Sequence, residues 1–107
     1  MEVVRYAVYW VNLDPTVGKE IKKTRPVVIV SPKVMNDNLD TVLVCPLTST
    51  IKKYPSRVNV VINGKQGSVA IDHMRSIDKS RIGQQLGILT KKESDSLLNT
   101  ILEVFKK

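Results

Sequence analysis

Apolar residues along this chain fall mostly into short runs that polar residues, glycine or proline interrupt. Runs of this length that are rich in β-branched and aromatic residues indicate β-strands, and a short run that is apolar throughout indicates a strand buried on both faces. Between them, residues 31–40 are predicted to form a loop or a helical turn, and Asn63-Gly64 a tight turn between strands. The predicted strands cover residues 6–13, 25–30, 41–47, 57–62, 68–71, 74–77 and 85–89.

The carboxyl-terminal residues change period, from alternation to the spacing of an α-helix. Apolar residues recur there at 97, 98, 101, 102 and 105, while polar residues fall largely on the opposite side. Thr90, followed three residues later by Glu93, fits a capping box at the start of this helix. We therefore expect a mainly β fold with a C-terminal α-helix, in which a small, strongly bent sheet or barrel receives the apolar stripe of the helix.

Length and charge narrow the class of protein. A chain of 107 residues is the size of one compact domain, so residues 1–107 are taken as a single domain. Lysine and arginine outnumber aspartate and glutamate by 17 to 10, a net charge of +7, which favours a polyanionic partner. Nucleic acid is the first candidate, then an acidic protein, then a membrane surface; a basic surface that only aids solubility is the alternative.

The sequence also limits where the protein is expected to act and which chemistry it can use. No stretch approaches the roughly 20 apolar residues that span a bilayer, and no signal-peptide pattern is evident, so we expect a cytoplasmic protein without a membrane partner. Cys45, in an apolar run, is expected to be a small buried side chain. His73 is the only histidine, which excludes a histidine pair as acid and base, and no ligand spacing indicates a metal or another cofactor.

Three polar segments carry the candidate chemistry. The first is the basic segment 18–25, in which Arg25 adjoins Pro26 at the start of an apolar strand. A guanidinium fixed in this way offers a fork of donors that suits a phosphate, whereas the rest of the segment is more typical of a solvated connection.

The second segment places hydroxyl groups directly after an apolar strand. Thr48, Ser49 and Thr50 follow the strand, and the cations of the same loop are Lys52, Lys53 and Arg57. Hydroxyls and cations together suit a phosphate backbone, although hydroxyls at a strand end also often bond to neighbouring backbone.

The third segment, residues 72–81, mixes charges within a strand-like pattern. It contains Asp72, His73 and Arg75. An aspartate and an arginine at such spacing can form a simple ion pair, and a lone histidine is more often structural than substrate-binding.

Four blocks of the sequence together resemble the MazF/PemK toxins of bacterial toxin–antitoxin pairs. They are residues 9–20 (YWVNLDPTVGKE), 23–31 (KTRPVVIVS), 46–49 (PLTS) and 72–81 (DHMRSIDKSR), in the order and spacing of that family over nearly the whole chain. The resemblance implies a small SH3-like β-barrel of the MazF/Kid/CcdB type. It also implies a homodimer that cleaves single-stranded RNA at short sequences without a metal ion or a ribosome. A cognate antitoxin would silence it.

The resemblance also assigns roles to particular residues. Arg25 and Thr48 match the catalytic pair of the family, and the residues of the surrounding pocket are Glu20, Ser49, Asp72 and Arg75. Glu20 is expected to orient or deprotonate the attacking hydroxyl. Arg25 is assigned to the charge on the phosphorane and to proton donation, because RNA supplies its own 2′-hydroxyl nucleophile. The residues expected to bind RNA are Lys19, Ser49, Thr50, Lys53, Arg57, Asp72, His73 and Arg75.

Two departures from the family pattern limit this transfer. The Kid-like branch has a histidine in the first loop and an arginine two positions before the aspartate, where this chain has Lys19 and Ala70, so that acid–base scheme does not apply. His73 stands where the family often has glutamine, so the RNA base that this chain prefers cannot be transferred from the family.

Other classes of function remain open at this point. A CcdB-like toxin that binds and inhibits a protein such as gyrase would need an exposed apolar patch on the terminal helix. A basic RNA-binding protein that never cuts is a third possibility. Because the chain is cationic, the expected antitoxin is MazE-like, with a flexible, acidic C-terminal segment.

Overall fold

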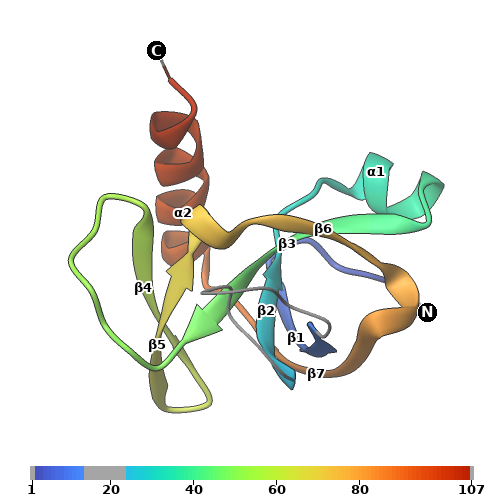
Figure 1. Cartoon of the computed structure of the whole chain (residues 1–107), viewed down its shortest axis with the longest axis horizontal. Helices are drawn as coiled ribbons and strands as arrows, with labels where there is room; N and C mark the ends of the chain where they lie inside the picture. The colour runs from blue at the N-terminus through green and yellow to red at the C-terminus, as the bar shows by residue number, and fades with distance from the viewer. Residues whose placement is uncertain (1, 14–23, 107) are drawn as a thin grey trace.

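The computed structural model describes residues 2–13 and 24–106 (Figure 1). Within these residues one antiparallel sheet curls into a half-barrel, in the strand order β4-β5-β3-β2-β1-β7, and β6 pairs with β3. The elements are β1 (Ala7–Asn12), β2 (Thr24–Ile29), α1 (Lys33–Asn38), β3 (Thr41–Thr48), β4 (Arg57–Ile62), β5 (Lys65–Ala70), η1 (Ile71–His73), β6 (Arg75–Asp78), η2 (Lys79–Arg81), β7 (Ile82–Ile88) and α2 (Lys91–Val104). The predicted mainly β fold with a C-terminal helix is confirmed.

Most predicted strands lie within one or two residues of the observed ones. The main differences are that β5 and β7 each begin three residues earlier than the apolar pattern indicates. Asn63 and Gly64 form the predicted tight turn with φ of 52° and 78°, so pairing between β4 and β5 starts at once, with Ile62 opposite Lys65. Backbone pairing therefore extends the strand into polar residues that the pattern of apolar residues cannot mark.

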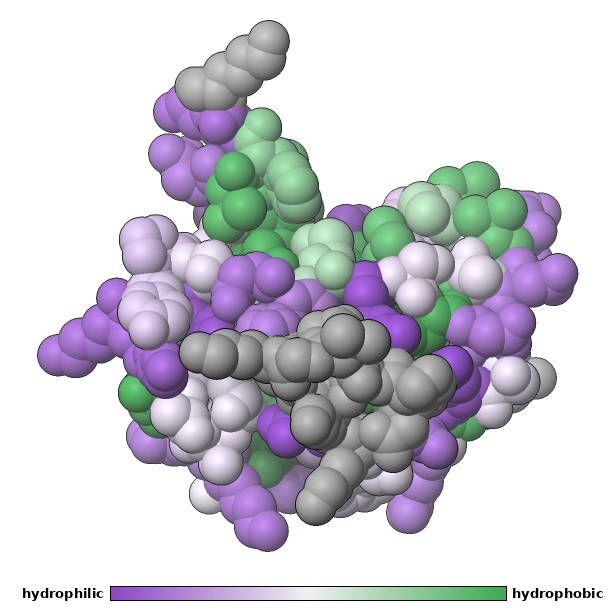
Figure 2. All heavy atoms as spheres, viewed as in Figure 1, coloured by the Kyte–Doolittle hydropathy of each residue, from purple (hydrophilic) through white to green (hydrophobic). Residues whose placement is uncertain are grey.

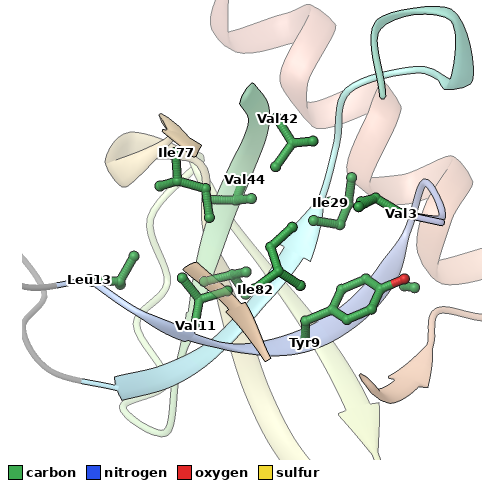
Figure 3. Packing of buried hydrophobic residues seen from close by; sticks show 11 residues of the cluster. Val3, Tyr9, Val11, Leu13, Ile29, Val42, Val44, Ile77 and Ile82 are labelled. Atoms are coloured by element: carbon green, nitrogen blue, oxygen red, sulfur yellow. The ribbon is translucent and has the colours of Figure 1, made fainter. Parts of the chain in front are cut away.

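Strand β3 is the centre of the fold because both of its faces are buried. Val42 and Val44 point into one core together with Tyr9, Ile29 and other side chains of β1, β2, β6 and β7 (Figure 3). The alternate residues Cys45 and Leu47 point into a second core, with residues of β4 and β5 and with Leu97 of α2. Two buried faces explain why the β3 segment is apolar almost throughout.

Helix α2 begins with the predicted capping box. The Thr90 hydroxyl accepts a hydrogen bond from the Glu93 amide at 3.1 Å, and Glu93 Oε1 accepts one from the Thr90 amide at 2.9 Å. Glu93 Oε2 also accepts a hydrogen bond from the Val61 amide of β4 at 2.8 Å. The carboxylate thus caps the helix and ties its first turn to the sheet.

The apolar stripe of α2 packs on the sheet over only part of its length. Leu97 is buried and Ile101 is half-buried, but Leu102 is 61% exposed and Phe105 is 70% exposed. The expectation that the whole stripe packs on the barrel is wrong, because the helix runs past the end of the sheet and its last turns stand clear of it (Figure 1). The helix therefore presents an apolar end to its surroundings.

Neither helix of the described chain is long and apolar enough to cross a membrane.

Candidate active site

Arg25 and Thr48 lie at the adjoining ends of two paired strands. Antiparallel pairing sets Val27 opposite Pro46 and Ile29 opposite Val44. Arg25, two residues before Val27, and Thr48, two residues after Pro46, therefore stand at the same end of the strand pair. Arg25 Nη1 donates a hydrogen bond to the backbone oxygen of Leu47 at 3.3 Å. The apolar runs of β2 and β3 thus fix the position of a guanidinium and a hydroxyl that are 23 positions apart in the chain.

A pocket of about 410 Å³ opens at this end of the half-barrel, and Arg25, Thr48 and Ser49 all line it. The Thr48 hydroxyl accepts a hydrogen bond from the Thr50 amide at 3.2 Å, which leaves its own proton to donate to a ligand. Two hydroxyl groups and a guanidinium at one opening form a set of donors for a phosphate oxygen. The structure therefore brings together three of the residues that the sequence singled out.

Arg57 and Asp72 form a second cluster, outside the lining of this pocket. Arg57 Nε and Nη2 donate to the two carboxylate oxygens of Asp72 at 2.8 and 3.0 Å, and the Ser56 hydroxyl donates to Oδ1 at 3.1 Å. His73 Nε2 lies 3.5 Å from Asp72 Oδ2, and the Arg57 guanidinium carbon lies 5.5 Å from the centre of the Tyr54 ring. Asp72 therefore forms an ion pair, but its partner is Arg57 of β4 and not an arginine of residues 72–81, as the spacing in that segment suggested.

This cluster shifts the pKa values of both partners. Hydrogen bonds from Arg57 hold the pKa of Asp72 at about 2, helped by its own backbone amide and by Ser56, and opposed by desolvation. The same hydrogen bonds raise the pKa of Arg57 above its ordinary value. Asp72 is thus a stable carboxylate whose charge Arg57 largely neutralises.

The other predicted residues lie apart from the pocket or outside the described chain. Arg75 is half-buried on β6, and its Nη1 lies 3.4 Å from the backbone oxygen of Leu13. Lys53 is exposed in the segment between β3 and β4. Glu20 and Lys19 lie outside the residues that the structure describes.

Several residues that line the pocket were not predicted as part of a site. Trp10 of β1, Ile62 and Asn63 at the end of β4, Gln66 of β5 and Leu86 of β7 all contribute to its wall. The sequence marked Trp10 only as part of the block at residues 9–20, and its 39% exposure between two buried neighbours is known only from the structure. The other residues join the site only because β4 and β7 meet when the sheet curls.

Cys45 is a buried thiol, as expected from its apolar run. Burial raises its pKa to about 12, and the charge of Asp72 adds to the shift, so the reactive thiolate is disfavoured. Among the described residues, no three histidine, cysteine, aspartate or glutamate side chains gather in a metal-binding arrangement.

A comparison with known protein families agrees with the fold. Residues 4–105 match the model of the PemK-like, MazF-like toxins of type II toxin–antitoxin systems. The chain belongs to this family.

Two relatives to which the chain is similar are MazF endoribonucleases. The chain is 35% identical to the endoribonuclease toxin MazF of Escherichia coli K12 over 68 residues, 64% of this chain and 61% of that toxin, so the match spans about three fifths of that relative. It is 30% identical to the endoribonuclease MazF of Staphylococcus saprophyticus over 88% of this chain and 83% of the relative.

Solved structures of MazF from Deinococcus radiodurans have the same fold. One crystal structure of that MazF superposes with a TM-score of 0.84 at 28% identity, covering 97% of this chain and 96% of the other. A MazE–MazF crystal structure from the same organism gives a TM-score of 0.80 at 27% identity, with the same coverage. The predicted barrel of the MazF type is confirmed.

Proposed function

We propose that the protein is an endoribonuclease toxin that cuts single-stranded RNA at short sequences without a metal ion or a ribosome. The observation that carries the proposal is the placement of Arg25 and Thr48 at the same end of paired strands, where both line one pocket. Endoribonuclease relatives that match most of the chain support it. Arginine and hydroxyl donors can stabilise a phosphorane by themselves, and the substrate brings its own nucleophile, so the reaction needs no metal-bound water.

The proposed reaction is a transesterification within the RNA chain. The 2′-oxygen forms a bond to the adjacent phosphorus as the bond from phosphorus to the 5′-oxygen breaks, which leaves a 2′,3′-cyclic phosphate and a 5′-hydroxyl end. Glu20 takes the 2′-hydroxyl proton, and the leaving 5′-oxygen receives one from Arg25 or from water. Arg25 stabilises the added charge on phosphorus, while Thr48 and Ser49 donate hydrogen bonds to the phosphate oxygens.

Incubation of the purified protein with single-stranded RNA in excess chelator tests this proposal. We expect cleavage to continue, with products that polynucleotide kinase labels directly because they carry 5′-hydroxyl ends. RNA that stays intact over many hours, with or without added Mg²⁺, would reject the endoribonuclease. That outcome would leave the RNA-binding protein that never cuts and the CcdB-like toxin, for which the exposed apolar end of α2 is the surface needed.

We also propose that the protein forms a homodimer through the apolar end of α2. Leu102, Val104 and Phe105 are exposed there, and Figure 2 shows apolar atoms on this part of the helix. A second copy would cover them, whereas a lone chain leaves them in water. We expect the wild-type mass in solution to be twice that of the chain, and Phe105→Asp to shift it toward the single chain.

Ile51→Asp is the matched control for this test. It adds the same charge at another exposed apolar residue, in the segment between β3 and β4, and should leave the mass unchanged. A wild-type protein with the mass of one chain at micromolar concentration would contradict the dimer.

A cognate antitoxin with a flexible, acidic C-terminal segment is the proposed protein partner, and both act in the cytoplasm. The net charge of +7 supports this chemistry, and MazF of Deinococcus radiodurans crystallises with MazE. Because charges drive such an association, its affinity should fall as salt rises. Inhibition by a neutral, prefolded partner that salt does not affect would contradict the proposal.

A further inference from the structure

The pocket beside Arg25 and Thr48 continues past these two residues into an apolar recess. Trp10, Pro26, Ile62 and Leu86 form its walls, and Leu47 lies beside Thr48. A phosphate needs none of these side chains, so the proposed chemistry leaves most of the pocket unexplained. No acidic residue is among those that line it in the described chain, which suits the approach of a polyanion.

The walls of this recess are held by contacts between strands. Trp10 pairs directly with Pro26 across β1 and β2. Asn63 Nδ2 donates a hydrogen bond to the backbone oxygen of Leu86 at 2.9 Å, which ties the β4–β5 turn to β7. A Cβ atom added at Gly87 would lie 3.4 Å from Ile62 Cγ2, so these two strands are in close contact. The recess is therefore formed before any ligand binds.

Polar groups at the edge of the recess can form hydrogen bonds with a planar ligand that lies between the apolar walls. Gln66 is exposed at the edge of the pocket, and its side-chain amide can both donate and accept a hydrogen bond. Asn63 Nδ2 donates a hydrogen bond to the backbone oxygen of Leu86, which leaves Asn63 Oδ1 as an acceptor. Lys65 adds a positive charge at the same edge. Apolar walls with a few placed polar groups are typical of small-ligand sites of this volume.

We propose that this recess binds the base of a nucleotide next to the scissile phosphate, with Trp10 as the stacking surface and Gln66 as the group that selects the base. Unstacked bases of single-stranded RNA bind to aromatic faces and are read along their hydrogen-bonding edges. The inference rests on the proposed function, because it takes the phosphate at Arg25 and Thr48 as its starting point. Trp10 and Gln66 are thus specificity-determining residues of the proposed cleavage.

The fluorescence of Trp10 tests the stacking directly, because Trp10 is the only tryptophan in the chain. The probes are four 2′-O-methyl heptanucleotides, one for each base, together with an abasic strand of equal length; none of them can be cut. We expect saturable quenching that is strongest with one base and absent with the abasic strand. Binding without quenching, or equal quenching by the abasic strand, would overturn the inference.

This measurement is independent of cleavage. A protein that shows base-dependent quenching and never cuts RNA would refute the proposed function and keep the base site. A protein that cuts RNA without base-dependent quenching would refute the base site alone. Quenching by the antitoxin but by none of the oligonucleotides would mean that the recess takes a protein side chain, which also refutes it.

Variants of the two residues provide a second test. We expect Trp10→Leu to weaken oligonucleotide binding about 10-fold or more and Trp10→Phe to restore part of the loss, because stacking needs a ring. Gln66→Ala should change which base flanks the mapped 5′-hydroxyl ends, while Gln84→Ala, an exposed glutamine on β7, should not. An unchanged cleavage map in Gln66→Ala would contradict its role even if Trp10→Leu failed to fold.

Discussion

Replacing Arg25 with alanine should lower the rate of RNA cleavage about 100- to 1000-fold while the protein stays folded. Removing one preorganised donor from developing negative charge has effects of this size, and Arg25 lines the pocket together with Thr48. Because the interaction strengthens in the transition state, kcat should fall far more than KM rises. Arg25→Lys, which keeps the charge but loses the planar fork, should recover only part of the activity.

The measurement is the initial rate of appearance of 5′-hydroxyl ends, with thermal melting as the check on folding. Lys92→Ala is the matched control, because it removes one positive charge from an exposed position of α2 and lines none of this pocket. It should cut RNA at close to the wild-type rate. Equal losses in the two variants would mean that Arg25 contributes only to overall charge, and a folded Arg25→Ala protein with full activity would remove Arg25 from the mechanism.

Replacing Asp72 with asparagine should destabilise the protein by about 1–3 kcal/mol at neutral pH, since hydrogen bonds to charged groups contribute at about this level. Asp72 is the carboxylate partner of the Arg57 side chain, which is only 9% exposed. Asparagine accepts one of the two hydrogen bonds and leaves the buried guanidinium without its countercharge. Asp72 itself is 36% exposed, so solvent screening keeps the loss below that of a fully buried pair.

The stabilisation by Asp72 should depend on pH in a defined direction. The folded state lowers the pKa of Asp72 from 3.8 to about 2, so the unfolded chain takes up the proton first as the pH falls. The contribution is therefore complete above about pH 4 and disappears as the pH falls toward 2. We expect the difference in free energy of unfolding between the wild type and Asp72→Asn to shrink across this window in urea titrations.

Asp37→Asn is the control for this experiment. It removes a carboxylate whose ion pair with Lys33, at 2.6 Å, lies on the surface of α1, where such pairs contribute little. Its stability should match that of the wild type at every pH. A difference between wild type and Asp72→Asn that stays constant down to pH 2 would show that the ionised carboxylate is not what stabilises the cluster.

The Arg57–Asp72 cluster shows how much of the candidate site could be predicted from the sequence. Arg57 and Asp72 were each selected as RNA-binding residues, and the alternative of an ion pair was open for the aspartate. Their separation of 15 positions along the chain cannot indicate a bidentate contact. The contact arises because Arg57 begins β4 opposite Ala70 of β5, two residues before Asp72.

The C-terminal helix shows a different limit. The period of apolar residues and the capping box specified where α2 begins, because both depend on residues three or four apart. The same period could not indicate where the supporting sheet ends. The exposure of Leu102 and Phe105 depends on the length and curl of that sheet.

The sequence by itself determined the strands, the capped helix and the Arg25–Thr48 pair, because these follow from local periodicity, turn chemistry and the blocks shared with one family. Only the tertiary structure decided what surrounds that pair: the Arg57–Asp72 cluster, the exposed end of α2 and the recess lined by Trp10, Ile62 and Leu86. Those arrangements join strands that are distant in the chain, and the curl of the sheet that brings them together is a property of the packed cores as a whole.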